Sequence, residues 1–571
     1  MSGMLRRTRS AAITRPVVRW ALAAMLAMAA CTPSPPVRTP TPTAAPAPAT
    51  APTAIAAHTL PTPSPVPGPN SLSWVQDSTF YLLHVGSFAD SDQDGVGDLK
   101  GLLNRLDYLN DGDPATSVDL GVGVLCLLPV FSASSMHGFD TLDHFAIRPE
   151  YGSAQDLQEL LRECHRRGMR VVLEYVLGYV SDQQPFFQHA YDHLPSVYSD
   201  WFFWLDYPQT LYKSFAGVAT LPLLNSASKG VQDYALRVAR FWMDPDGDGD
   251  YSDGVDGYLC DHAEGLSHAF WQSVHAWCRT ARPDLLLLGQ VQGNALDIAS
   301  FWKDEFDATL DVPLHTLLTG QAVDRSVGVL SGTGLPALID GALAQRSALN
   351  VEGAVSINYL NKQDTDRALS SVGSDPLRSR LAATLLLTLP GTPLVYYGEE
   401  IGMSGLRGNG EPFGSEHSRE PMDWYASEGG PGMPTWFRPP DRNNRPNDGT
   451  SVEEETSDPE SLLSHYRCLI QLRATYGALR TGTYERVQLT QDTPYVLAYL
   501  RQDAATRLLV VLNFDVKEAQ ITLDLGASTL PGTGWKVTDL LCNRTLRSFS
   551  GASGELLLGP QEGLLLELAL P

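Results

Sequence analysis

Basic side chains are scarce in this sequence, and the deficit limits the class of partner. The 571 residues include 41 Lys and Arg against 65 Asp and Glu, which gives a formal net charge of −24 at pH 7. A surface this acidic repels the phosphate backbone of nucleic acids and favours neutral ligands or cations. We therefore expect no nucleic acid among the partners of this protein.

Cysteine is also rare, with seven residues in the whole chain. Apart from Cys31, their spacing fits neither a metal site nor a dense disulfide framework. Most of them lie in apolar stretches, where cysteine packs as a small hydrophobic residue. We expect buried free thiols, although export from the cytoplasm would leave room for an isolated disulfide.

The N-terminal segment lacks a hydrophobic run long enough to span a bilayer. Trp20–Met28 is far shorter than the ~20 residues required. It follows five arginines and precedes Ala29-Ala30-Cys31, a pattern typical of a signal peptide over residues 1–30. The cysteine resembles that of a bacterial lipobox, which implies lipidation of Cys31 and anchoring to the outer side of the cell membrane by lipid alone. An ordinary secretory signal is the alternative, and both place the protein outside the cytoplasm.

Residues 31–70 lack the apolar side chains needed for a core. They are mostly Pro, Thr, Ala and Ser, a composition typical of an extended, semi-rigid tether. At about 3.1 Å per residue, the tether could hold the folded part on the order of 100 Å from its anchor. We expect the fold to start near Ser71.

From Phe80 onward, short apolar runs alternate with helical patterns such as Ala154–Arg167. The runs predict strands at Phe80–Val85, Val122–Leu128, Arg170–Val176, Tyr258–Cys260, Leu285–Gly289, Phe306–Leu310, Gly353–Tyr359 and Pro393–Tyr397. Eight strands alternating with helices predict a (β/α)8 TIM barrel over residues 71–478, with a small insertion (B) domain at 178–228 after strand 3. Short strands separated by Gly and Asp predict a C-terminal antiparallel β-sandwich over residues 479–571.

Two loops rich in aspartate have the pattern of a calcium site. In the first, Asp90, Asp92, Asp94 and Asp98 alternate with other residues, and Gly95 permits a sharp turn. An EF-hand would need Glu at the twelfth position, where Gly101 stands, so we expect a different structural Ca2+ loop. Its expected ligands are Asp90, Asp92, Asp94, the Val96 carbonyl and Asp98. A solvated acidic turn is the alternative, and residues 244–250 form a second candidate.

Several longer motifs resemble those of the α-amylase superfamily of glycoside hydrolases. They are Ser87-Phe-Ala-Asp90, Gly97-Asp-Leu-Lys-Gly101, His137-Gly-Phe-Asp140, Ile147-Arg-Pro-Glu-Tyr-Gly152, Ser181-Asp-Gln-Gln-Pro-Phe-Phe187, Asp256-Gly-Tyr-Leu-Cys-Asp261 and Gly391-Thr-Pro-Leu-Val-Tyr-Tyr-Gly-Glu-Glu-Ile-Gly402. The resemblance covers about residues 81–478 and implies the barrel, with the sandwich as the family's C-terminal domain.

The resemblance implies a retaining cleavage of α-glucosidic bonds and assigns three catalytic positions. In this chemistry one carboxylate attacks the anomeric carbon and a second acid protonates the leaving oxygen. The nucleophile position falls on Asp261, and the third acid, which grips sugar hydroxyls, falls on Asp364. The general acid position falls on Gln290. An amide cannot donate this proton, so a step worth roughly 10²–10⁴-fold is missing.

Other family positions around the chemistry are also replaced. Leu259 stands where the family has an Arg that keeps the nucleophile ionised. Gly178-Tyr179 replaces Asn-His, with Glu174 in place of the first Asp of that motif, and Lys362-Gln363 replaces Asn-His before Asp364. In the insertion, Pro-Asp-Leu-Asn becomes Pro222-Leu-Leu-Asn225. These losses predict a disabled active site, with His262, Glu264 or Glu174 as the alternatives for a substitute acid.

The sugar-holding positions are better preserved. Phe139 keeps an aromatic ring that can stack on a pyranose. His137, Asp140 and Arg367 keep hydrogen-bonding groups that the family uses near the bond cleaved. Each of these residues could instead be structural.

Three hypotheses follow. The first is a tethered α-amylase-like protein with impaired or no hydrolysis that binds α-glucan, such as a maltooligosaccharide, or a partner through the old cleft. The second is an active retaining α-glucan hydrolase or transglycosylase with an unorthodox general acid. The third is a structural surface protein that binds no sugar.

Overall fold

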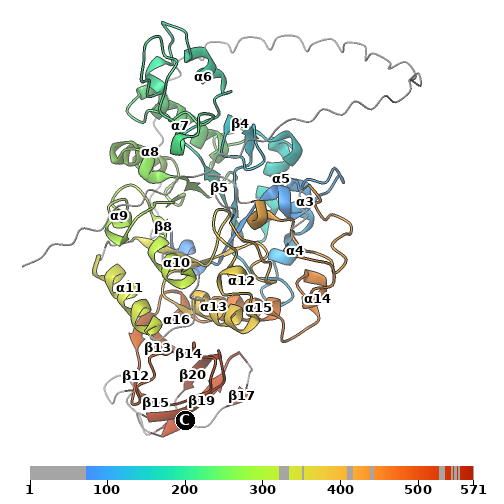
Figure 1. Ribbon diagram of the computed structural model, residues 1–571, viewed down its shortest axis with the longest axis vertical. Coiled ribbons are helices and arrows are strands. Elements are labelled where there is room, and N and C mark those ends of the chain that lie inside the picture. Colours follow the sequence, from blue (N-terminus) through green and yellow to red (C-terminus); the bar gives the residue numbers. More distant parts are fainter. Residues whose placement is uncertain are drawn as a thin grey trace, which may run out of the picture. The chain divides into compact units, whose positions relative to one another are not determined.

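The core of the protein is a closed barrel of eight parallel strands (Figure 1). The computed structural model describes residues 72–320, 334–349, 351, 353–407, 416–436, 443–525, 534–541, 544–545, 549–550 and 553–569. In chain order the barrel strands are β1 (Phe80–Leu83), β2 (Val124–Leu127), β5 (Arg170–Tyr175), β6 (Gly257–Cys260), β7 (Leu286–Gly289), β8 (Ala308–Leu310), β9 (Val355–Tyr359) and β10 (Thr392–Tyr396). β10 pairs with β1 and closes the barrel, which confirms the predicted fold class. The expected signal peptide, tether and Cys31 lie outside the described residues.

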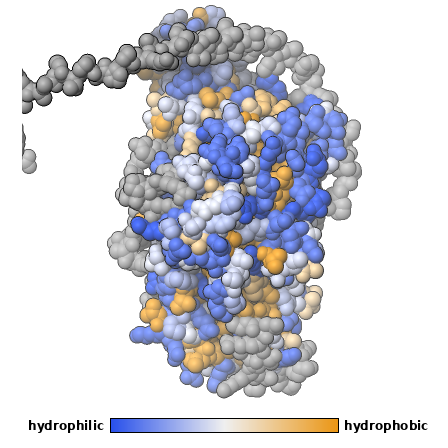
Figure 2. Space-filling view, turned by 90° about the vertical axis from the view of Figure 1, so that its right-hand side faces the viewer, coloured by the Kyte–Doolittle hydropathy of each residue, from blue (hydrophilic) through white to orange (hydrophobic). Residues whose placement is uncertain are grey.

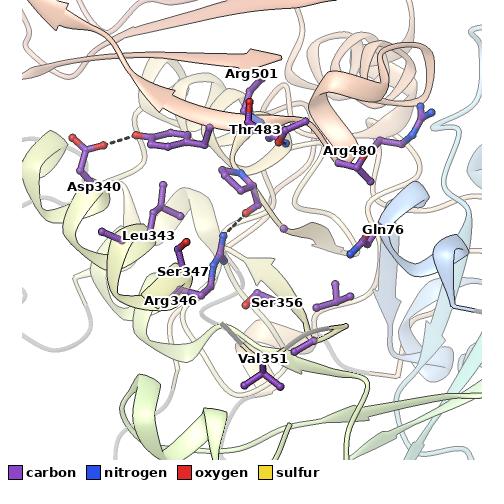
Figure 3. A pocket seen from close by; sticks show the side chains of 18 of the residues that line it. Gln76, Asp340, Leu343, Arg346, Ser347, Val351, Ser356, Arg480, Thr483 and Arg501 are labelled. Carbon is purple, nitrogen blue, oxygen red and sulfur yellow. Dashed lines mark hydrogen bonds between the residues drawn. The ribbon is translucent and has the colours of Figure 1, made fainter. Parts of the chain in front are cut away.

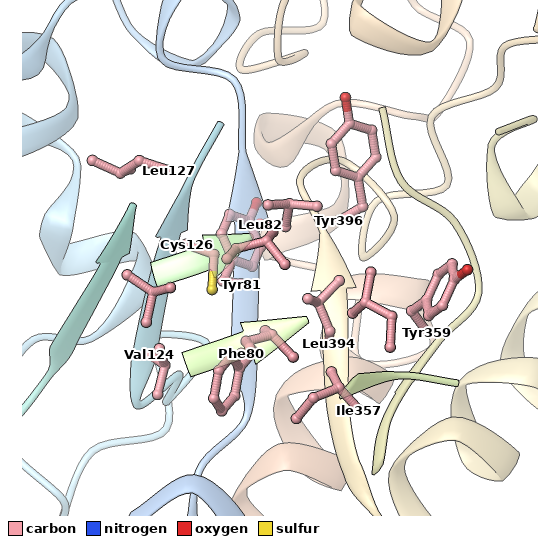
Figure 4. Packing of buried hydrophobic residues seen from close by; sticks show 14 of the residues in the cluster. Phe80, Tyr81, Leu82, Val124, Cys126, Leu127, Ile357, Tyr359, Leu394 and Tyr396 are labelled. Carbon is pink, nitrogen blue, oxygen red and sulfur yellow. The ribbon is translucent and has the colours of Figure 1, made fainter. Parts of the chain in front are cut away.

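The strands are buried on both faces, which explains their continuous apolar sequence. All four residues of β1, β2, β6 and β7 are buried. Figure 4 shows side chains of neighbouring strands packed together, among them Phe80, Leu82 and Val124. Parallel pairing sets Phe80 beside Val124 and Leu394.

Helices surround the barrel (Figure 1). Each begins and ends as follows: α1 (Ser73–Asp77), α2 (Val85–Phe88), α3 (Leu99–Asn104), α4 (Leu106–Leu109), α5 (Ala154–Arg166), α7 (Lys229–Met243), α8 (His268–Ala281), α9 (Ala295–Ala299), α10 (Val312–Thr319), α11 (Leu335–Leu349), α12 (Ala368–Ser371), α13 (Pro376–Thr388), α14 (Val452–Thr456), α15 (Leu462–Thr475) and α16 (Gly477–Arg480). α5 is typical, because Ser153 and Asp156 form a capping box at its start and Leu157, Leu160 and Leu161 are buried.

Two irregular segments extend from the C-terminal ends of barrel strands. The first is the hairpin of β3 (Phe131–Ala133) and β4 (Thr141–Ile147), which follows β2. The second lies between β5 and α7, where the insertion was expected, and contains α6 (Pro185–Ala190) and the short 3-10 helices η2 (Ser199–Trp201) and η3 (Phe215–Gly217). Isolated β-bridges, including Tyr179 to Leu223, hold this insertion together.

The C-terminal strands pair antiparallel in two sheets that meet at β16 (Gly534–Asp539), as the predicted sandwich requires. The strands are β11 (Thr483–Arg486), β12 (Gln488–Leu489), β13 (Val496–Gln502), β14 (Arg507–Asn513), β15 (Ala519–Asp524), β16 (Gly534–Asp539), β17 (Arg544–Thr545), β18 (Phe549–Ser550), β19 (Ser553–Leu558) and β20 (Gly563–Ala569). Leu509, Ile521 and Leu566 belong to the core between them. Arg501 joins this region to the barrel by donating to the Thr388 carbonyl at 2.6 Å.

Cys126, Cys164, Cys260 and Cys278 are free thiols, and all four are buried. Within the described part of the chain, no helix is long and apolar enough to cross a membrane. Hydrophilic residues dominate the face seen in Figure 2, with hydrophobic residues in small separate groups.

Candidate active site

The nucleophile candidate Asp261 directly follows β6, at the end of the barrel where the loops converge. It is buried, and both of its carboxylate oxygens accept hydrogen bonds from side chains. The Tyr179 hydroxyl donates to Oδ2 at 2.8 Å. The Gln290 amide donates from Nε2 to Oδ1 at 3.1 Å. Two neutral donors therefore hold the one group that could attack a sugar.

Strand register explains why Gln290 reaches Asp261. β6 and β7 pair in parallel with Cys260 beside Gly289, so the next residue of each strand lies side by side. The Gln290 backbone N–H also donates to the Cys260 carbonyl at 3.0 Å. A carboxylate only accepts hydrogen bonds, so the amide must turn its NH2 group toward Asp261. Its Oε1 is buried and has no hydrogen-bond partner among the described residues.

An aromatic stack from the insertion lies over the nucleophile's donor. The Tyr179 and Phe215 rings stack with centroids 4.4 Å apart. Phe215 also meets the His262 ring edge-on at 4.9 Å, next to Asp261 in the chain. Together these rings cover the surroundings of the carboxylate, consistent with its exposed fraction of only 6%.

Asp364, the third catalytic position, is paired with a cation. The Lys362 ammonium contacts Asp364 Oδ1 and is itself 2% exposed. Burial raises the pKa of Asp364, but the Lys362 charge, helped by Arg407 and Arg419, outweighs burial and leaves this pKa below its ordinary value. Asp364 is therefore ionised, and one of its oxygens is already engaged.

Glu174 is the most perturbed acid of the site. Burial, followed by the nearby Asp261 charge, raises the pKa of Glu174 well above its ordinary value. Gln363 Nε2 donates to Glu174 Oε1 at 3.4 Å, and Oε2 has no hydrogen-bond partner in the described chain. Glu174 pairs in register with Leu259, two residues before Asp261, so it lies one layer deeper in the barrel.

Asp261 itself titrates above its ordinary range. Burial raises its pKa, and the Tyr179 hydrogen bond and the Lys362 charge only partly offset this. Leu259 contributes no charge and is buried. The nucleophile therefore lacks an adjacent cation on its own strand.

The residues expected to hold sugar divide into two groups. His137, Phe139 and Asp140 lie together in the turn between β3 and β4, where the Phe139 N–H donates to His137 Nδ1 at 3.1 Å and Asp140 accepts from the Ser135 hydroxyl at 2.6 Å. Phe139 packs in a small cluster with Tyr179.

Arg367 lies apart, directly before α12 in the loop that follows β9. It is fully buried, donates to the Tyr397 carbonyl at 2.6 Å and places its guanidinium 4.7 Å from the Tyr397 ring centre. These contacts give Arg367 a structural role in the arrangement seen here.

The other substitute acid, Glu264, pairs with His262. His262 Nδ1 lies 3.1 Å from Glu264 Oε1, in a backbone turn where His262 has φ 46°. Burial lowers the pKa of His262, but the Glu264 and Asp261 charges outweigh it and raise this pKa. This contact engages the Glu264 carboxylate with His262. Glu264 is therefore not free to act as the proton donor.

Arg419 is a site residue that no sequence motif indicated. It ends the short 3-10 helix η5 (Glu416–Arg419), is 1% exposed, and its Nε and Nη1 have no hydrogen-bond partner among the residues described. Burial, followed by the Arg419 charge, lowers the pKa of His137 to about 3. Burial and the Arg419 charge therefore keep the imidazole neutral, and His137 can serve as both donor and acceptor.

The first aspartate loop brings three of its expected ligands together. Oxygens of Asp90, Asp92 and Asp98 all lie within 4.8 Å of one another, whereas Asp94 is not part of this group and accepts the Val96 N–H at 2.7 Å. Asp98 also caps α3 through the Gly101 N–H at 2.8 Å. Three hard oxygen donors at this spacing fit a calcium ion. Asp244, Asp246 and Asp248 form a second such group.

Comparison with known proteins identifies the family. The family model described as the α-amylase catalytic domain matches residues 83–482. The chain belongs to the α-amylase family of glycoside hydrolases. Alpha-amylase 3 of Dictyoglomus thermophilum is 30% identical over 460 residues, covering 77% of this chain and 85% of that protein. Neopullulanase 2 of Thermoactinomyces vulgaris is 33% identical over 481 residues, covering 82% and 70%.

A solved structure agrees with this assignment. The crystal structure of an α-amylase from H. orenii superposes with a TM-score of 0.73 at 28% identity, covering 86% of this chain and 99% of that one. As an α-amylase family member, the protein belongs to carbohydrate metabolism. Of the three positions that the sequence resemblance assigns, the structure brings Asp261 and Gln290 into direct contact.

Proposed function

We propose that this protein is a hydrolytically impaired α-amylase family member that binds α-glucan, such as a maltooligosaccharide, through the barrel cleft. One observation carries the proposal: the Gln290 amide occupies the general acid position and donates to Asp261 at 3.1 Å. Retaining glycosidases need two carboxyl groups about 5–5.5 Å apart, one of them able to give and take a proton. An amide in direct contact with the nucleophile meets neither requirement.

Two further contacts support impairment. The Tyr179 hydroxyl holds the other oxygen of Asp261, and burial together with the Asp261 charge raises the pKa of Tyr179 well above its usual range, so this group is a weak acid. Lys362 engages Asp364, which in the family's chemistry would grip sugar hydroxyls. All three catalytic positions are therefore occupied by contacts within the protein.

Hydrolysis of two substrates tests the impairment. Purified protein and its Asp261→Asn variant are incubated with maltoheptaose and with a 4-nitrophenyl maltooligoside. We expect no products from maltoheptaose, and at most slow release of 4-nitrophenol, because an activated leaving group needs little acid assistance. Turnover of maltoheptaose at an ordinary rate that Asp261→Asn abolishes would overturn the proposal.

Calorimetry with maltoheptaose tests the binding. We expect saturable binding that His137→Ala weakens and His189→Ala, an exposed histidine of the insertion, leaves unchanged. Absence of binding would favour a structural surface protein instead.

An active enzyme with an unorthodox acid is the second candidate, because burial and the Asp261 charge raise the pKa of Glu174 well above its ordinary value and so favour its protonated form. Its exposed fraction of 1%, one layer below Asp261, argues against contact with a glycosidic oxygen. If Glu174 is the acid, Glu174→Gln should abolish turnover of maltoheptaose.

We also propose that Asp90, Asp92 and Asp98 bind a structural Ca2+ and that Cys31 anchors the chain outside the cytoplasm. The acidic loop supports the first proposal and the N-terminal sequence supports the second. Membrane fractionation of cells expressing the full chain and its Cys31→Ala variant tests the anchor. Release of the variant, but not of the unaltered chain, into the soluble extracytoplasmic fraction is the expected result.

A further inference from the structure

A large cleft opens on the side of the barrel opposite the candidate active site. It has a volume of about 960 Å³ and lies between α11, the N-terminal ends of β9 and β10, and the start of the C-terminal sheets. Figure 3 shows Arg346 and Ser347 on α11 facing Thr483, with Arg501 and Arg480 beyond. The volume lies in the range of small-molecule sites, about 300–1,000 Å³.

The lining of this cleft is richer in basic side chains than the protein as a whole. Its ionisable lining residues are Arg346, Arg480, Arg486, Arg501 and a single acid, Asp340. The whole chain has 65 acidic and 41 basic residues, so four arginines against one acid is a local reversal. A positive cleft on an acidic protein concentrates small anions locally.

Three of these arginines already have carboxylate partners. Arg346 lies 2.8 Å from Asp311, Arg480 lies 3.0 Å from Asp77, and Arg486 lies 3.3 Å from Asp340. Arg486 Nη1 nevertheless remains buried with no hydrogen-bond partner in the described chain. These pairs compensate the charge of the three arginines.

Arg501 differs, because it has no carboxylate partner among the described residues. It is fully buried, donates only to the carbonyls of Thr388 at 2.6 Å and Gly482 at 3.1 Å, and leaves Nε without a partner. Burial lowers the pKa of Arg501 to about 10. A buried cation compensated only by carbonyl dipoles is unfavourable.

A second buried guanidinium, which donates to backbone carbonyls, lies nearby. Arg473 is 1% exposed and donates to the carbonyls of Gly391 at 2.7 Å and Leu479 at 2.6 Å. Burial, followed by the Arg501 charge, lowers the pKa of Arg473 to about 9. Gly391 itself lines the cleft, so this second cation adds to the positive potential there.

We propose that this cleft is a binding site for a small organic anion bearing phosphate or carboxylate groups. Guanidinium groups bind both of these groups through paired N–H donors. Arg501 and Arg486 line the cleft and would supply the positive charge, and Ser347, Ser356 and Thr483 line the same space. An anion bound here would compensate Arg501 where the protein provides no carboxylate. The site is separate from the glucan cleft and does not depend on hydrolysis.

Calorimetric titration of the full chain with pyrophosphate and with citrate, at constant ionic strength, tests the proposal. Pyrophosphate presents only phosphate groups, whereas citrate presents carboxylates, so the two titrations distinguish the two chemistries. We expect saturable binding of at least one. Absence of saturable binding for both would overturn the proposal.

Charge variants on α11 locate the site without disturbing the domain contact. Ser347 is exposed and lines the cleft, so Ser347→Glu places a negative charge beside the anion and should weaken binding roughly fivefold to tenfold. Ala348→Glu adds the same charge to the next exposed position, which does not line the cleft, and should change affinity less than about twofold. Equal weakening by the two variants would contradict the proposed site. Arg501→Gln should abolish binding if the variant melts as cooperatively as the unaltered chain.

Discussion

Replacing Gln290 by glutamate restores the missing acid and tests whether that loss alone disables the site. In the present structure the amide donates to Asp261 Oδ1 at 3.1 Å. Gln290→Glu converts this attraction into the contact of two acids. Every other replaced position, including Leu259 and Tyr179, remains as it is.

The size of the repulsion between Asp261 and the new glutamate follows from their separation. Two like charges about 3 Å apart repel by about 5 kcal/mol at an effective dielectric constant of about 20. This equals roughly four pKa units, so at pH 7 the pair would hold a proton or the new side chain would move away. Burial already raises the pKa of Asp261, and no cation at position 259 opposes the change. The variant therefore gains an acid while its nucleophile loses charge.

We expect Gln290→Glu to raise maltoheptaose turnover by less than about tenfold, well below the 10²–10⁴-fold that general acid catalysis can supply. Catalytic groups that act as a unit are not additive, so Leu259→Arg combined with Gln290→Glu should gain more than the product of the single changes. The measurement is the initial rate of reducing-end formation, with Asp261→Asn added to each variant as the background control. A gain of 10²-fold or more from Gln290→Glu alone would refute this reasoning.

Three other predictions concern stability. Tyr179→Phe should lower the free energy of unfolding by about 1.5–3 kcal/mol, because it removes a hydrogen bond to a buried carboxylate, and an unchanged urea midpoint would contradict this. Burial raises the pKa of Glu399 from 4.5 to about 8, so in this pH range the folded chain retains a proton that the unfolded chain releases. The free energy of unfolding therefore falls as pH rises through this range. Glu399→Gln should reduce that fall between pH 5 and 8, as measured by urea titrations. Calcium at 100 times its Kd should add about 2.7 kcal/mol and raise Tm, EDTA should reverse the rise, and Asp92→Asn should remove most of it. A Tm insensitive to calcium would exclude the proposed ion.

The barrel could be predicted because each strand is encoded by a short run of neighbouring apolar residues. Runs such as Val124–Leu127 are wholly apolar, since the strand is covered on both faces. The helical pattern at Ala154–Arg167 corresponds to α5, which spans Ala154–Arg166. The contact between Asp261 and Gln290 also follows from the sequence, because each residue directly follows one of two adjacent strands.

Long-range contacts were beyond prediction. The Tyr179 hydroxyl bond to Asp261 depends on how the chain bends after β5, and the two residues are 82 positions apart. Arg367 has the sequence position of a sugar ligand, but packing places its guanidinium on Tyr397. Arg346 and Arg501, which line the basic cleft, share no motif and meet only when the C-terminal sheets pack on the barrel.

The substitutions around Asp261 redistribute charge as well as remove an acid. The family's Arg would stand at Leu259, level with Glu174 and two residues below the nucleophile. Leu259 supplies no charge to oppose burial and the Asp261 charge, which raise the pKa of Glu174 and favour its neutral form. The positive charge is instead on Lys362, which pairs with Asp364. Each acid in the substituted site is therefore stabilised by a proton, by a hydrogen-bond donor or by a cation. Restoring one family residue leaves the other acids in contact with substituted residues. Activity should therefore return only when the acid and the cation are restored together.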